Sequence, residues 1–267
     1  MDKIKPYDRR KLVFRILAEH GPMSVRGLSS CMTPAISKKK LRVVLSRLVK
    51  QGYLKKRNDR VFGNAGVFYQ IPQDEDKAAN VAKLLSVDTK SLIQPHFRHG
   101  HLLHSEQCAV WTEAFKLLVP EARVIRDHQF KLYPKMESLL LSRGDDIELR
   151  PDMVLLVKSQ ARSGDVAVAL EIERSTKCKR RLLMKLRKYA TQTRLDGMIY
   201  VCESAALTAT LRHIYKAQVL ENALRIKHYG NNFFLITDGS FNGATREPLM
   251  FNAATENVLF SSWINRK

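Results

Sequence analysis

The sequence is poor in acidic residues and has no closely spaced cysteines. Its 267 residues contain 26 Asp and Glu against 46 Lys and Arg, a formal net charge of +20. The 4 cysteines form no CxxC pair, which argues against a zinc finger or a disulfide scaffold and fits a reducing compartment. No apolar run approaches the roughly 18 residues of a spanning helix, and the first residues lack the apolar segment of a signal peptide. These absences predict a cytoplasmic protein without membrane insertion.

The excess of positive charge predicts a nucleic-acid partner, because cationic surfaces bind polyanions by releasing counterions. Residues 1–72 hold 17 Lys and Arg against 4 Asp and Glu, whereas the rest of the chain holds 29 against 22. The basic surface is therefore expected mainly in the N-terminal part. With 45% hydrophobic residues, the chain is long enough for two small domains.

Apolar spacing in the first 72 residues predicts three helices followed by two strands. Asp8 is expected to cap the first helix, Thr33 to cap the third, and Gly52 to end it. The expected elements are helices over residues 9–20, 24–32 and 34–51, then strands over 53–57 and 67–71 around a polar tip at 58–66.

This order of elements resembles the winged helix-turn-helix family over the whole stretch. The resemblance implies that the third helix enters the major groove of DNA and that the wing meets the DNA backbone. A basic, solvated face on a protein-docking winged helix is the alternative. The side chains expected to contact DNA are Lys38, Lys39, Lys40, Arg42, Arg47, Arg57 and Arg60.

A turn residue and a short acidic run follow this stretch at Pro72 and residues 73–76. We predict a first domain over residues 1–72, a linker over 73–98 with a small helix at 77–85, and a second domain over 99–267. The elements expected in the second domain are helices over 105–118, 180–190 and 206–219, and strands over 122–132, 147–157, 166–173, 196–202 and 233–237.

Carboxylates are expected at the ends of two strands of the second domain. Asp152 lies near the start of one strand, and Glu171 and Glu173 end the next, where period-two alternation points both to the same face. Together they can converge on Mg²⁺ or Mn²⁺, which would polarise a scissile phosphate and acidify a bound water. We expect Asp152 and Glu171 to be metal ligands, and Glu173 to be either a third ligand or a base.

Pro151-Asp152, followed after 18 residues by Glu171-Ile172-Glu173, resembles the PD-(D/E)XK nuclease superfamily. The resemblance implies an α/β (α+β) chain: an N-terminal winged helix-turn-helix followed by a restriction-endonuclease-like mixed-sheet core. The sequence departs from the motif where Glu173 takes the place of the lysine.

Further site residues follow from this resemblance. Lys185, on the helix after the acidic strand, would supply the missing positive charge and stabilise the pentavalent phosphate. Tyr189 would line the same side of the site. Glu106 is the candidate for an additional helix-borne acid, with Glu113 as its rival.

Arg150-Pro151-Asp152 and residues 170–176, together with Lys185 and Tyr189, are similar to the replication-relaxation proteins and MobC-type plasmid mobilisation relaxases. The resemblance implies a site-specific, metal-dependent nickase acting at a plasmid origin of transfer during conjugative mobilisation. It further implies an accessory mobilisation protein and a type IV coupling ATPase as partners, and no small-molecule cofactor.

Three questions stay open at the level of sequence. Tyr189, Tyr200 and Tyr215 are all conceivable nucleophiles for a covalent intermediate with DNA. A winged-helix regulator with a non-catalytic nuclease-like domain would carry the same motifs. So would a transposon or restriction-type endonuclease.

Overall fold

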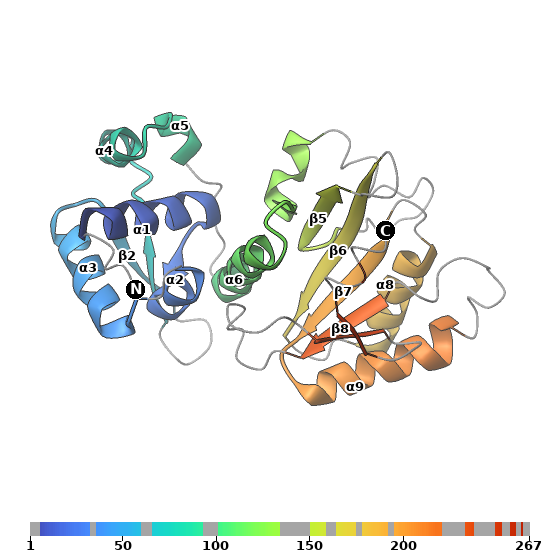
Figure 1. Cartoon of the computed structure of the whole chain (residues 1–267). Coiled ribbons are helices and arrows are strands. Elements are labelled where there is room, and N and C mark those ends of the chain that lie inside the picture. Colours follow the sequence, from blue (N-terminus) through green and yellow to red (C-terminus); the bar gives the residue numbers. More distant parts are fainter. Residues whose placement is uncertain are drawn as a thin grey trace. The chain divides into compact units, whose positions relative to one another are not determined.

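The computed structural model describes residues 6–32, 36–59, 66–92, 101–133, 150–158, 164–174, 178–191, 195–220, 233–237, 249–252, 257–259 and 263. The chain forms two compact units, Met1–Trp111 and Thr112–Lys267. Both units contain helices and strands, so the predicted mixed α/β class is confirmed (Figure 1). The boundary between the units lies within helix α6 (Leu102–Leu118).

The first unit begins with three helices and three short strands within its described part. Its sheet has the order β1-β3-β2, and both pairings are antiparallel. The predicted helices and hairpin are confirmed in order and type, whereas β1 was not predicted. The elements are α1 (Pro6–His20), β1 (Met23–Ser24), α2 (Val25–Cys31), α3 (Lys38–Lys50), β2 (Lys55–Asp59) and β3 (Gly66–Gln70).

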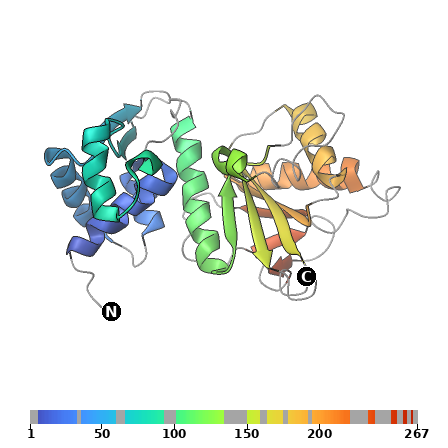
Figure 2. The same cartoon turned by 90° about the horizontal axis from the view of Figure 1, so that it is seen from above.

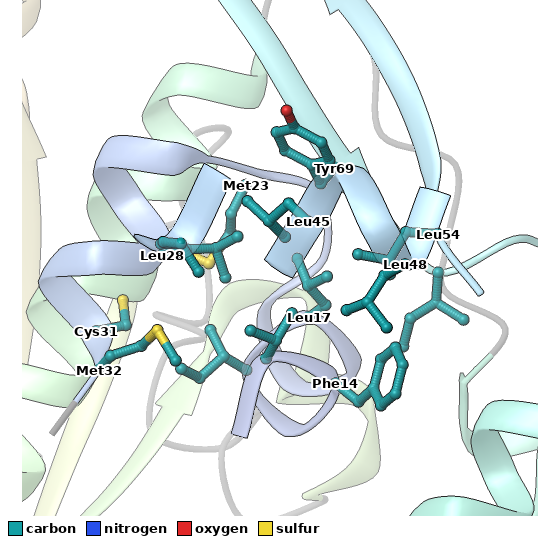
Figure 3. Packing of buried hydrophobic residues seen from close by; sticks show 14 of the residues in the cluster. Phe14, Leu17, Met23, Leu28, Cys31, Met32, Leu45, Leu48, Leu54 and Tyr69 are labelled. Carbon is teal, nitrogen blue, oxygen red and sulfur yellow. The ribbon is translucent and has the colours of Figure 1, made fainter. Parts of the chain in front are cut away.

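An apolar core holds these elements together. Leu17 of α1, Leu28 of α2 and Leu45 of α3 are at most 1% exposed. Figure 3 shows these side chains directed toward one another beneath Tyr69 of β3. Burial of each of these leucine side chains stabilises the folded state by roughly 1.5–3 kcal/mol. The apolar residues that repeat with helical spacing in the sequence are therefore the ones that form this core.

Two predicted helix caps are wrong. Helix α1 begins at Pro6, so Asp8 lies in its first turn; proline suits this position because its missing N–H needs no partner. Helix α3 begins after Ser37, whose Oγ accepts a hydrogen bond from the Lys40 N–H at 3.4 Å. The predicted cap Thr33 lies outside the described residues. The predicted end of α3 is confirmed, because Gly52 takes a left-handed φ of 77° directly after Gln51.

Residues predicted as a linker form part of the first unit. Helix α4 (Glu75–Leu85), which contains the small helix predicted there, begins after Asp74, and helix α5 (Thr89–Leu92) follows it. Val81 and Leu92 belong to the same apolar core as α1. The compact unit continues to Trp111, whereas the sequence placed the end of the first domain at residue 72.

The second unit contains a seven-stranded mixed sheet among its described residues. Its order is β10-β9-β8-β7-β6-β5-β4, with antiparallel pairing from β4 to β6, parallel pairing from β6 to β8, and antiparallel pairing beyond β8. The strands are β4 (Arg123–Arg126), β5 (Met153–Lys158), β6 (Asp165–Glu173), β7 (Gly197–Cys202), β8 (Phe233–Thr237), β9 (Leu249–Asn252) and β10 (Asn257–Leu259).

Helices α8 (Lys179–Thr191) and α9 (Ala205–Ile214) lie on the same face of this sheet (Figures 1 and 2). Leu186 of α8 and Leu211 of α9 are buried in one cluster with Ala169 of β6. Both helices connect parallel strands, as such pairs require. After α9 the chain continues as the π-helical segment η3 (Tyr215–Leu220). Within the described ranges, no helix is long and apolar enough to span a bilayer.

The strand predicted over residues 122–132 is too long. Strand β4 ends at Arg126, and the chain continues as the 3₁₀ helix η2 (Asp127–Leu132). The Gln129 side-chain oxygen accepts the Arg126 N–H at 3.1 Å, and Phe130 is buried. These tertiary and capping contacts stop the strand despite its apolar pattern.

Strand β5 begins at Met153, whereas the prediction began it at residue 147. Residues 147–149 lie outside the described part of the chain. Pro151 has no N–H to give to a sheet ladder, which explains why regular pairing starts only after it. Asp152 therefore lies directly before the strand, near its entry as predicted.

Candidate active site

The backbone of the neighbouring strand holds Asp152 at the start of β5. Its Oδ2 accepts a hydrogen bond from the Ile172 N–H at 2.7 Å. Because Met153 pairs with Leu170 in an antiparallel ladder, Asp152 takes the register position opposite Glu171. The strand pairing therefore brings these two carboxylates close together.

Glu171 lies on β6, is only 3% exposed, and receives two side chains from α8. The Lys185 Nζ is 2.6 Å from its Oε2, and the Tyr189 hydroxyl donates to its Oε1 at 2.5 Å. Lys185 and Tyr189 are four residues apart, which places them on one face of the helix. The structure thus brings together Asp152, Glu171, Lys185 and Tyr189.

The surroundings of Glu171 disfavour its charged form. Burial raises its pKa to about 7, the Lys185 ammonium opposes this rise, and the charge of Asp152 adds to it. Loss of water penalises an ionised carboxyl, and a second carboxylate nearby penalises it further. A single ammonium therefore offsets only part of the cost of keeping these carboxylates ionised.

Glu173 lies two residues further along β6, on the face of Glu171, and is 2% exposed. In the parallel ladder to β7, Glu171 is the partner of Tyr200 and Glu173 that of Cys202. Burial raises the pKa of Tyr200 well above its ordinary value, and the charges of Glu171, Glu173 and Asp152 raise it further. All three carboxylates therefore disfavour the ionised form of this one buried phenol.

The three tyrosines left open as nucleophiles are buried. Tyr189, Tyr200 and Tyr215 are 6%, 0% and 2% exposed. Burial raises the pKa of Tyr189 and Tyr200 well above the ordinary value and that of Tyr215 to about 12. A hydroxyl nucleophile needs activation toward its anion, and these surroundings oppose the phenolate. In this arrangement none of the three is prepared to attack a phosphate.

The residues present fit a divalent cation in chemistry and charge. Carboxylate oxygens are the donors that Mg²⁺ and Mn²⁺ take, and a cation would relieve the repulsion between Asp152 and Glu171. Among the described residues, the donor oxygens of Asp152, Glu171 and Glu173 do not all lie within 4.8 Å of one another. Lys185 already contacts one oxygen of Glu171, so a metal ion and the ammonium would share that carboxylate.

Glu106 does not join this group of carboxylates. Its Oε2 accepts the Ser24 N–H at 2.5 Å and its Oε1 accepts the Ser24 hydroxyl at 2.9 Å, so both oxygens are engaged in the first unit. A Cβ added at Gly27 would lie 2.4 Å from the Glu106 Cδ, so the helix backbone of α2 lies against this side chain. The predicted role of Glu106 as a helix-borne acid of the site does not match this placement. Its rival Glu113 contacts Lys116, with the charged atoms 2.9 Å apart.

The basic residues predicted to contact DNA lie mostly on the exposed side of the first unit. Helix α3 exposes Lys38, Lys39, Lys40, Arg42 and Arg47, and Arg57 is half-buried on β2. Arg60 lies outside the described residues. Val43, also on α3, is 58% exposed among these cations.

Comparisons with family models, curated proteins and solved structures found no match to the chain. The interpretation of the site therefore depends on its own residues. Sequence reasoning missed the contact between Glu106 and Ser24, which are 82 positions apart.

Proposed function

We propose that the chain is a metal-dependent DNA endonuclease whose first unit binds DNA and whose second unit cuts one strand. The observation that carries the proposal is the Asp152 and Glu171 pair on neighbouring strands, with Lys185 of α8 on Glu171. Acidic residues at adjacent strand ends with a nearby lysine are the group that metal-assisted phosphodiester cleavage uses.

The order of elements supports a PD-(D/E)XK core. From α6 onward the chain runs through a helix, three antiparallel strands, a helix and a strand parallel to the third. Lys185 comes from the helix and replaces the lysine that Glu173 displaces on β6. The Lys185 Nζ lies 2.6 Å from the Glu171 Oε2, which supports a lysine from α8 in the role of the motif lysine expected on β6.

The first unit supports a winged helix that binds DNA. Helix α3 follows α2 after a short connection, and the β2–β3 hairpin follows α3. The exposed face of α3 carries Lys39, Arg42 and Arg47, with Val43 between them. Cations suit phosphates and guanine edges, and an exposed apolar side chain suits a thymine methyl group. These features favour DNA over an acidic protein as the partner.

The chemistry assigned to each group follows from its surroundings. A cation held by Asp152 and Glu171 would polarise the phosphate and acidify a bound water. Glu173 serves as a further ligand or as a base for that water. Lys185 stabilises charge that develops on the phosphate. The burial of Tyr189, Tyr200 and Tyr215 favours attack by water over a covalent tyrosine intermediate.

The more specific part of the proposal comes from the sequence resemblance. We propose that the cut is a nick at a plasmid origin of transfer, as in MobC-type relaxases. An accessory mobilisation protein and a coupling ATPase would then be its partners. One observation favours a second candidate, a regulator with a non-catalytic core: both oxygens of Glu171 already have partners within the protein.

A plasmid-nicking assay separates these candidates. Supercoiled plasmid carrying the DNA that flanks the gene is incubated with protein and Mg²⁺, Mn²⁺ or EDTA. We expect open circles with either metal, and a loss on the order of 10²-fold or more in Asp152→Asn and Glu171→Gln. Glu121→Gln, which changes an exposed carboxyl outside the site, is the matched control.

Each outcome of this assay selects one candidate. Linear product would indicate a restriction-type enzyme. Binding of DNA without cleavage under any metal would contradict the nuclease and favour the regulator. A wild-type rate in Asp152→Asn would show that the cut is made elsewhere.

A further inference from the structure

Helix α8 carries a strip of exposed cations beside the carboxylates. Six of its 13 residues are Lys or Arg, and none is acidic. Leu182, Leu186 and Tyr189 are buried against the sheet. The other side exposes Arg180, Arg181 and Arg187, with Met184 37% exposed among them and Lys188 half-buried. We call Arg180, Arg181, Met184, Arg187 and Lys188 the α8 strip.

Helical geometry makes this strip continuous and places its edge at the site. At about 100° per residue, the five members fall within roughly 120° of the helix circumference. The next position around the helix is Lys185, whose Nζ contacts Glu171 at 2.6 Å. After it comes Tyr189, which also contacts Glu171. The strip therefore leads from the outer surface of α8 directly to the carboxylates.

From these observations we infer that the α8 strip binds the phosphate backbone of the DNA strand that the carboxylates cut. This inference rests on the proposed nuclease function, because it concerns the strand that the carboxylates cut. The residues of the α8 strip are separate from the proposed catalytic residues. Arg180 and Lys188 lie roughly 12 Å apart along the axis of α8, which is comparable to the length of duplex axis over which one strand presents three or four phosphates, at about 3.4 Å of axis each. Arginine suits this task because its planar fork binds phosphate oxygens in pairs.

A membrane surface fits the strip less well than DNA does. Basic amphipathic helices that lie on membranes insert an apolar face between the lipids. The apolar face of α8 is already used, because Leu182 and Leu186 are each 1% exposed and pack against the sheet. Only Met184 remains as an exposed apolar side chain on the strip. Charge complementarity without a free apolar face favours a polyanion in solution.

The test compares two sets of three substitutions in the full chain. The strip variant is Arg180→Gln, Arg181→Gln and Arg187→Gln. The control variant is Lys158→Gln, Arg212→Gln and Lys216→Gln, which removes the same charge from exposed positions of the second unit. A third variant with lysine at the three strip positions keeps the charge. Circular dichroism checks that each variant is folded.

Binding to a labelled DNA duplex is measured over a range of salt concentrations in EDTA, so that cleavage plays no part. Each phosphate contact contributes about 0.9 to the slope of log K against log salt, so the strip variant should lose roughly two to three units of slope and at least about tenfold in affinity. The control variant should change much less, and the lysine variant should recover most of the slope.

The outcomes distinguish this inference from the proposed function. Equal slopes for the strip and control variants would overturn the inference even if the wild type nicks plasmid. A reduced slope together with a wild type that never nicks would retain the DNA contact and reject the nuclease. Loss of binding to vesicles of anionic lipid without any change on DNA would also overturn the inference, in favour of a membrane surface.

Discussion

Two tyrosines beside Glu171 differ in a single hydrogen bond. The Tyr189 hydroxyl donates to Glu171 at 2.5 Å, whereas the Tyr200 hydroxyl is buried with no hydrogen-bond partner among the described residues. A buried hydroxyl without a partner lowers stability, because it has lost its water and gained nothing. The pair therefore offers a direct test of the site's polar contacts.

We expect Tyr189→Phe and Tyr200→Phe to have opposite effects on stability. Loss of a hydrogen bond to a charged group should lower the free energy of unfolding by about 1.5–3 kcal/mol in Tyr189→Phe. Removing the unpartnered hydroxyl in Tyr200→Phe should leave it unchanged or raise it by up to about 1 kcal/mol. Urea denaturation measures both. Equal losses in the two variants would mean that Tyr200 has a hydrogen-bond partner in solution.

The sequence predicts the carboxylates of the site but not all of their neighbours. Asp152 and Glu171 could be paired from strand spacing, because antiparallel neighbours place such residues opposite each other. Lys185 and Tyr189 came from family resemblance, and they contact Glu171. Glu106 was assigned to the site from its place on a helix, yet it binds Ser24 in the first unit. The position of a carboxyl on a helix does not predict which residues the carboxyl contacts when it is buried.

At the scale of elements, Glu106 and Ser24 fix the start of α2. Ser24 Oγ accepts the Gly27 N–H at 3.1 Å while it donates to Glu106. Burial raises the pKa of Glu106 above its ordinary value, although the hydrogen bonds from Ser24 and the charge of Arg26 oppose the rise. The carboxyl is thus easier to protonate in the folded chain than in the unfolded one.

We expect the stability contribution of Glu106 to depend on pH. Because its folded pKa is raised, the contribution is fully present below the unfolded value near 4.5 and is lost as pH rises through the folded pKa. Relative to Glu106→Gln, the wild type should therefore gain Tm when pH is lowered from 7 toward 4.5. Thermal melts across this range measure the difference. A difference that does not change with pH would contradict the burial of this carboxyl.

Ser24→Ala provides a control in which the pH dependence of the stability change has the opposite sign. It removes a cap worth about 1–2 kcal/mol, and it also removes a hydroxyl that favours the ionised form of Glu106. Its cost should therefore be larger at pH 7 than at pH 4.5, whereas Glu106→Gln removes the pH dependence.

Elements with strong periodicity were the easiest to predict. The apolar repeat of α3 and the long apolar run of β6 gave their type and approximate ends. Elements that depend on distant contacts were not predictable in this way. Two-residue β1 has no periodicity, β4 stops where Gln129 caps Arg126, and α4 was assigned to a linker although its apolar side joins the first core.

At the scale of the whole molecule, with its net charge of +20, helices α3 and α8 each contain 6 Lys or Arg and no acidic residue. Helix α3 exposes its cations in the first unit, and α8 exposes its own in the second. Charge of this size attracts DNA of any sequence, and only contacts with base edges select one sequence. In the proposed winged-helix arrangement, the selective contacts would come from α3 in the first unit.

We expect removal of charge from α3 to weaken DNA binding more than removal of equal charge elsewhere in the same unit. Lys39→Gln, Lys40→Gln and Arg42→Gln together should lower the slope of log K against log salt by roughly two to three units. The control set is Lys77→Gln, Lys83→Gln and Lys90→Gln on α4 and α5, all exposed. Titration of a labelled duplex at several salt concentrations measures both sets. Indistinguishable slopes would remove α3 from the DNA interface.

In the sequence of helix α8, residues of its exposed face alternate with residues of its buried face. Outward Arg181 is followed by inward Leu182, and inward Leu186 by outward Arg187. A deletion of one residue inside the helix would rotate everything beyond it by about 100°, turning cations toward the sheet and leucines toward solvent. Evolution can therefore change the side chains of α8 one at a time, but the length between Arg180 and Tyr189 must stay constant.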